Sequence, residues 1–279
     1  MAADGQAFED ILFEIDGPVA TISLNRPSAR NAWTLGMGAE VEQALAMCHS
    51  DDRVRAVIVC GVGDRDFCVG ADLSGRDIAA PGGQPTGKTR PELSPPSVCK
   101  PVIAAMNGNA VGIGTTYPLL CDIRIVAEDA KVGLPFVRRG VMGEANSHWI
   151  LQRLVGFATA AELLLSGRLI SGAEAAAMGL CSQALPGPEV VPAARSLALE
   201  IAANTAPLSV AASKQMLWEA LDLPRGQAAA RESQLFMWLA GQRDATEGVA
   251  SFLEHRPPAW TLSASTPLPA PDSSQSDGT

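Results

Sequence analysis

The sequence has few of the residues that build metal centres and disulfide frameworks. It contains three histidines and six cysteines among 279 residues. The cysteines are scattered through apolar stretches without CxxC or another metal-ligand spacing, and His49 and His255 are isolated along the chain. This usage predicts no metal site. It is typical of a reduced protein, so we expect a cytoplasmic location.

Long apolar runs and an excess of basic residues are also absent. No window approaches the ~18 uninterrupted apolar residues of a membrane span, and the start, MAADGQAFEDILFEID, lacks the pattern of a secretory signal. The 21 Lys and Arg residues are outnumbered by 30 Asp and Glu residues, which gives a net charge of −9. We therefore expect no membrane partner and no general nucleic-acid binding.

Apolar residues are abundant instead. They make up 47% of the chain, against 18% charged residues, enough for a sizeable core in one large or two modest domains. The surplus of apolar residues also indicates an interface between subunits.

Strand and helix patterns alternate along the first half of the chain. Residues 11–27 read as two alternating strands around a turn at 16–18, and residues 34–50 have helical spacing with Thr34 as N-cap. Apolar strands are expected within 54–63, 101–108 and 122–135, and helices follow from about residue 146. This order predicts an α/β fold with a parallel sheet.

Two stretches depart from that order. Residues 75–97 are rich in proline and glycine and are predicted to be a long mobile surface segment. Residues 261–279 are rich in proline and serine with few apolar anchors, and we expect a disordered tail there.

Two glycine-containing turns each follow an apolar strand. In DFCVGADLSG, Gly70 permits the turn and Ala71 presents an unobstructed N–H. In MNGNAVGIGTTYPLLCD, Gly112-Ile113-Gly114 opens a helix, whose first N–H groups lack intrahelical partners. Two such amides aimed at one point make an oxyanion hole, although each turn is also explained by close packing alone. Neither matches a phosphate-binding or dinucleotide-binding glycine motif.

Taken together, SLNRPSARNAW, FCVGADL and KPVIAAMNGNAVGIGTTYPLLCDIRIVAEDAKVGLPFVRRGV resemble the crotonase (enoyl-CoA hydratase/isomerase) superfamily over roughly residues 8–256. The resemblance implies a crotonase-like ββα-repeat spiral core at 1–200 and a C-terminal helical trimerisation region at 201–260. It implies an acyl-CoA thioester substrate and a homotrimer or homohexamer, with no cofactor beyond the substrate's coenzyme A. By this resemblance the N–H groups of Ala71 and Ile113 hold the thioester oxygen.

The resemblance also implies a set of substrate-binding and CoA-binding positions. They are Arg26, Ala29, Gly70, Asp72, Leu73, Gly112, Thr116 and Phe136. Arg26 and Arg30 are suited to the anionic nucleotide, but a salt bridge at a strand end explains Arg26 equally well. Asp72 reads as a structural turn acid.

The positions of the acidic side chains distinguish a hydratase from an isomerase. Hydratases similar to this chain use two glutamates, at the positions that Thr116 and Phe136 occupy here. Glu144, eight positions after Phe136, lies where the resembling Δ3,Δ2-enoyl-CoA isomerases place a single glutamate. Apolar neighbours such as Phe136 and Val141 are expected to raise the pKa of Glu144 by desolvation. The alternative role of Glu144 is to favour a helix N-terminus.

Three functions remain open at this point. The favoured one is an enoyl-CoA isomerase with Glu144 as its single base. The others are a hydratase-like enzyme of altered mechanism and a non-catalytic acyl-CoA-binding protein. His148 is a weaker candidate for the same pocket.

Overall fold

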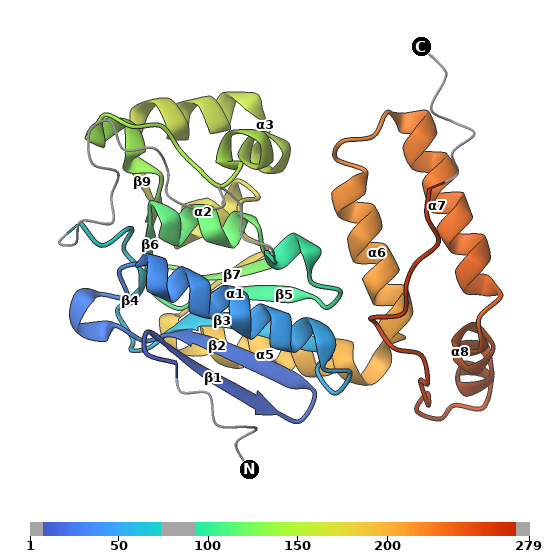
Figure 1. Cartoon of the computed structure of the whole chain (residues 1–279). Coiled ribbons are helices and arrows are strands. Elements are labelled where there is room, and N and C mark those ends of the chain that lie inside the picture. Colours follow the sequence, from blue (N-terminus) through green and yellow to red (C-terminus); the bar gives the residue numbers. More distant parts are fainter. Residues whose placement is uncertain (1–7, 74–92, 272–279) are drawn as a thin grey trace.

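The main sheet grows from an N-terminal hairpin. The computed structural model describes residues 8–73 and 93–271 (Figure 1). The six strands of this sheet, in spatial order, are β1 (Ile11–Asp16), β2 (Val19–Leu24), β3 (Ala56–Gly61), β5 (Val102–Met106), β7 (Ile123–Ala127) and β10 (Gln183–Leu185). Only β1 and β2 pair antiparallel, as the turn signal at 16–18 predicts, and the other pairs are parallel. The predicted α/β fold with parallel strands is present.

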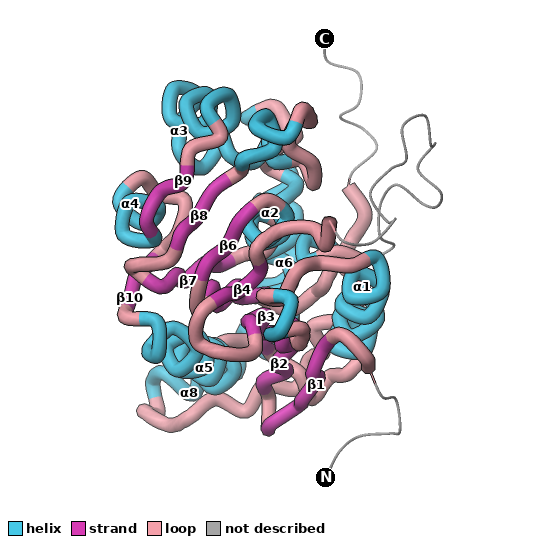
Figure 2. The backbone as a smooth tube through the Cα atoms, turned by 90° about the vertical axis from the view of Figure 1, so that its left-hand side faces the viewer, coloured by secondary structure: helices cyan, strands magenta, loops and turns pink. Residues whose placement is uncertain are grey.

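A second, four-stranded sheet carries the turns of interest. Its order is β4 (Asp66–Cys68), β6 (Asn109–Val111), β8 (Lys131–Gly133) and β9 (Leu169–Ser171). β4, β6 and β8 are parallel, and Figure 2 shows the four strands side by side. Because β4 and β6 are parallel neighbours, the turns that follow them emerge at the same edge of the sheet.

The described helices are α1 (Leu35–Ser50), α2 (Ile113–Leu119), α3 (Ser147–Ser166), α4 (Gly172–Ala177), α5 (Gly187–Asn204), α6 (Pro207–Glu219), α7 (Arg225–Ala240) and α8 (Arg243–Leu253). Thr34 is the N-cap of α1, as predicted, because its hydroxyl accepts a 2.9 Å bond from the N–H of Met37. α5 packs against the main sheet, while α6, α7 and α8 form a separate group beside it (Figure 1).

α3 is long and apolar enough to be a candidate membrane span by length and composition, which is weak evidence for a single helix. Its backbone is broken at Gly156, with φ 77° and ψ 160°. The break leaves two segments, each shorter than the roughly 20 residues that a span needs.

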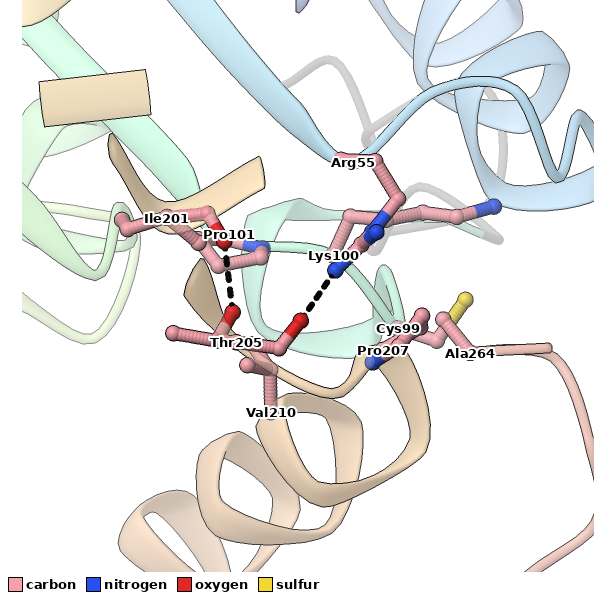
Figure 3. Close-up of a pocket in the computed structure, with 9 residues that line it drawn as sticks. All are labelled: Arg55, Cys99, Lys100, Pro101, Ile201, Thr205, Pro207, Val210 and Ala264. Atoms are coloured by element: carbon pink, nitrogen blue, oxygen red, sulfur yellow. Dashed lines mark hydrogen bonds between the residues drawn. The ribbon is translucent and has the colours of Figure 1, made fainter. Parts of the chain in front are cut away.

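A buried lysine ties the C-terminal helices to the core. Lys214 of α6 lies 2.7 Å from Asp122 and donates to the carbonyl oxygens of Pro95 (2.6 Å) and Lys100 (2.9 Å). The same junction contains Arg55, which donates to the Thr205 carbonyl oxygen between α5 and α6 (Figure 3). The C-terminal region is therefore held by buried polar contacts as well as by apolar packing.

The expectation of a disordered tail is wrong for residues 261–271. The backbone N–H and hydroxyl of Thr261 donate to Asp244, at 3.0 and 2.9 Å, and the Ser263 hydroxyl donates to Asp52. Ala264 is buried in the junction drawn in Figure 3. Carboxylates of the folded chain thus supply partners that the tail's own composition does not reveal. Residues 272–279, and residues 75–92 of the predicted mobile segment, lie outside the described part.

Candidate active site

The two glycine turns touch one another. A Cβ placed on Gly112, at φ +60°, would lie 3.6 Å from the Cα of Gly70, which itself has φ +114°. A Cβ on Gly114 would lie 2.0 Å from the carbonyl oxygen of Cys68 at the end of β4. Glycine is required at 114 because any side chain would collide with that backbone. These close approaches bring the start of α2 against the turn after β4.

The two amides predicted to hold a thioester oxygen are both available. Within the described residues, neither the Ala71 N–H nor the Ile113 N–H donates to a protein acceptor. Ile113 is the first residue of α2, so its N–H has no carbonyl one turn earlier. On either side of Ala71, the Trp33 N–H donates to the Gly70 carbonyl oxygen and the Asp72 N–H donates to the Trp33 carbonyl oxygen, at 2.8 Å each. The adjoining turns therefore present two free donors.

Glu144 is joined to α2 by its side chain. The hydroxyl of Thr116, which is fully buried, donates to Glu144 Oε1. The carboxylate caps none of the described helices: α3 begins at Ser147, with Asn146 as N-cap and no acid in the first turn. Ala145 and Asn146 adopt left-handed backbone conformations, with φ 53° and 58°, which are uncommon for residues other than glycine. The capping interpretation of Glu144 therefore has no contact to support it.

Desolvation raises the pKa of the Glu144 carboxyl, and the hydrogen bond from Thr116 opposes this by stabilising the charged form. Glu144 is exposed to solvent as a whole residue and lines the cavity described next, while its hydrogen bond to Thr116 is partly buried. Of the two neighbours expected to desolvate it, Val141 is 58% exposed and does not enclose the group. Phe136 is partly buried, and its ring lies close to Gly112.

A large cavity opens beside these groups. It has a volume of about 980 Å³ and is lined by parts of α1, α2, α3 and α6 and by Leu93, Ser94, Pro96 and Ser97. Ile113 and Glu144 are in its wall, so one predicted amide donor and the predicted base share this space. Sequence reasoning did not place Tyr117 and Trp218 here. Tyr117 follows Ile113 by one helical turn, a spacing that puts both on the same face of α2.

The cationic positions near the turns are occupied by internal ion pairs. Arg26 donates to Asp72 at 2.9 Å and to the Ala32 carbonyl oxygen at 2.7 Å, and Arg30 binds Asp66 through two bonds of 2.7 and 2.9 Å. These contacts match the salt-bridge interpretation of Arg26 and the structural interpretation of Asp72.

Four further positions of the described chain, Ala29, Leu73, His148 and His49, do not line the cavity. Ala29 ends a short 3-10 helix, Pro27–Ala29, and Leu73 is 70% exposed. His148 is exposed on α3, and His49 accepts a bond from the Cys99 N–H, at 3.3 Å. In the parts of the chain that the structure describes, no group of three metal-ligating side chains occurs.

Comparison with known proteins identifies this arrangement. Residues 14–263 match the model of the family described as enoyl-CoA hydratase/isomerase. The chain belongs to the enoyl-CoA hydratase/isomerase family. It is 36% identical to an enoyl-CoA hydratase of Alternaria alternata (88% of this chain, 85% of that protein) and 35% identical to the 2,3-dehydroadipyl-CoA hydratase of Escherichia coli (86% and 94%).

Solved structures of the family agree with the fold. A probable enoyl-CoA hydratase/isomerase from Mycobacterium abscessus superposes with a TM-score of 0.85 at 39% identity, and covers 90% of this chain and 98% of that one. The predicted crotonase-like fold is thereby confirmed, and the chain is an acyl-CoA enzyme of this family. The Alternaria and Escherichia relatives are named hydratases, so these names do not support the preference for an isomerase.

Proposed function

We propose that this family enzyme moves a double bond, converting 3-enoyl-CoA to 2-enoyl-CoA with Glu144 as its single base. One observation carries the proposal: Glu144 reaches the cavity beside Ile113 and bonds to Thr116, whereas the two hydratase positions hold Thr116 and Phe136. A hydratase must hold and activate water, while an isomerase needs only one group that accepts and returns a proton.

The proposed reaction balances without water. The Glu144 carboxylate removes a proton from C2 of the thioester, and the electrons of that bond move into the carbonyl. The enolate oxygen accepts hydrogen bonds from the N–H groups of Ala71 and Ile113, which are strongest when the negative charge has developed. Glu144 then returns its proton at C4, as the double bond between C2 and C3 forms and the one between C3 and C4 is lost.

The raised pKa of Glu144 suits this cycle, because a base near its ordinary pKa accepts protons weakly at neutral pH. We propose no cofactor beyond the coenzyme A of the substrate. Its thioester supplies the acidity at C2, once the enolate oxygen is stabilised.

A homotrimer or homohexamer in the cytoplasm is part of the same proposal. α7 and α8 expose large apolar side chains, among them Phe236, Met237 and Phe252, each more than two-thirds exposed in the single chain. Such a surface suits burial between subunits. All six cysteines are free thiols, which suits a reducing compartment. Light scattering that finds only monomer at micromolar concentration would remove the oligomer.

The second candidate is a hydratase-like enzyme of altered mechanism, favoured by the printed names of the two relatives. It predicts addition of water to 2-enoyl-CoA at the cavity wall that holds Glu144. A non-catalytic acyl-CoA-binding protein predicts binding without turnover.

A panel of 2-enoyl-CoA and 3-enoyl-CoA esters, followed by the absorbance of the conjugated thioester, separates the three. A gain of absorbance with 3-enoyl-CoA supports isomerisation. A loss with 2-enoyl-CoA alone supports hydration, and no change with either supports binding alone.

A further inference from the structure

Most of the tryptophan and tyrosine side chains lie at the cavity, where they pack against the edge of the core. The chain has five tryptophans and one tyrosine, and four of these six line the cavity: Trp33, Tyr117, Trp149 and Trp218. All four are half-buried, so part of each ring surface is left uncovered. Among the described residues, the buried core holds a single aromatic side chain, Phe67. The cavity walls therefore differ in chemistry from the interior of the protein.

Each tryptophan is fixed by a contact of its own. Trp33 stacks on Tyr117, with ring centroids 4.9 Å apart and planes tilted by 38°. The Arg153 guanidinium lies over the Trp149 ring, 4.0 Å from its centroid. The Trp218 indole N–H donates to Asp122 at 2.9 Å, and Asp122 is held by Lys214. The walls are consequently preorganised flat surfaces, and a ligand does not have to order them.

Such walls favour a flat ligand over a flexible chain. Aromatic rings gain energy from offset or edge-to-face contact beyond the area that they bury, and a ring loses less torsional freedom on binding than an alkyl chain. The volume of about 980 Å³ lies at the upper end of pockets that hold drug-sized ligands. It leaves room for a ring beyond the reacting carbons.

We propose that this cavity selects acyl-CoA substrates whose acyl chain ends in an aromatic ring. The inference rests on the proposed function only in that the cavity is taken to hold the acyl group. Trp33 and Trp149 are its specificity-determining residues.

The test compares two thioesters with the same carbon skeleton and a saturated butanoyl chain, 4-phenylbutanoyl-CoA and 4-cyclohexylbutanoyl-CoA, by calorimetric titration of the full chain. Free coenzyme A is the third ligand. The phenyl ester is expected to bind the wild-type protein several-fold to about tenfold more tightly, from the ordinary strength of aromatic contacts. Because these esters cannot react, the result does not depend on which reaction the enzyme catalyses.

Substitutions test whether Trp33 and Trp149 cause the tighter binding of the phenyl ester. Trp149→Leu and Trp33→Leu should each reduce it towards equality, and Trp149→Phe, which keeps an aromatic face, should retain most of it. Trp238→Leu is the matched control, because Trp238 lies on α7 and does not line the cavity. It should leave the preference unchanged.

Equal or tighter binding of the cyclohexyl ester to the wild-type protein would overturn the proposal. So would an equal loss for free coenzyme A in the Leu variants, since the rings would then hold the nucleotide. The wild-type comparison stands even if a Leu variant fails to fold.

Discussion

The hydrogen bond from Thr116 to Glu144 gives a prediction that separates the base from a passive carboxylate. Thr116→Val keeps the shape of a fully buried side chain and removes the one hydroxyl that donates to Glu144 Oε1. Hydrogen bonds to charged groups contribute ~1.5–3 kcal/mol. We expect the lower end, because the cavity lets water replace part of the bond. That free energy corresponds to a change of about tenfold in the acid dissociation constant of Glu144.

The direction of the pKa shift in Thr116→Val follows from which form of Glu144 the hydrogen bond stabilises. The bond favours the charged carboxylate, so its loss should raise the pKa of Glu144 further above its ordinary value. In the variant, kcat/KM for 3-enoyl-CoA should be about tenfold lower on the acidic side of the profile. The deficit should shrink as the pH rises and the carboxyl ionises in both proteins.

The assay is the pH dependence of kcat/KM, together with the carboxyl band of Glu144 in infrared difference spectra against a Glu144→Gln sample. Thr116→Ser restores the donor and should restore both readouts. An acidic limb at the same pH in wild type and Thr116→Val would refute the reasoning. A shifted carboxyl band with an unshifted rate profile would mean that the pair exists but that Glu144 is not the base.

Further predictions concern the turns and the stability cost of desolvating the Glu144 carboxyl. Ala71→Pro deletes one amide donor and should lower kcat by ~10²–10³ while leaving binding of a saturated acyl-CoA nearly unchanged; a folded variant with normal turnover would exclude Ala71 as a donor. Gly114→Ala places a Cβ 2.0 Å from the Cys68 carbonyl oxygen and should cost ~1–3 kcal/mol or more in denaturant unfolding; an unchanged midpoint would contradict that packing. Glu144→Gln should be more stable than wild type at neutral pH. The raised pKa means that folding disfavours the charged carboxyl, a cost fully present above the folded pKa and absent below the unfolded one. The advantage should therefore vanish at acidic pH, whereas a capping role predicts lower stability of the variant at neutral pH.

Local rules predicted the elements whose causes lie within a few residues. The hairpin at 11–24 follows from alternation around a glycine turn, and Thr34 begins α1 because its hydroxyl reaches an N–H three residues away. The free amide of Ile113 is also local, since any helix leaves its first donors unpaired. These predictions needed no knowledge of distant contacts.

Contacts between distant residues were not available to such rules. The partner of Glu144 lies 28 residues away, and the Ser263 hydroxyl finds Asp52 across 211 residues. Composition alone therefore predicted disorder for residues that the fold supplies with acceptors. Trp218 was missed as a wall of the cavity for the same reason, because it comes from a part of the chain distant from Trp33 and Trp149.

The role of Glu144 is tested most directly by isomerisation of a 3-enoyl-CoA ester by wild type and Glu144→Gln, measured beside the binding of a saturated acyl-CoA. The account predicts that binding survives in the variant and that turnover falls by ~10²–10⁴ or more, as for loss of a general base. Near-wild-type turnover by a folded Glu144→Gln protein would contradict it.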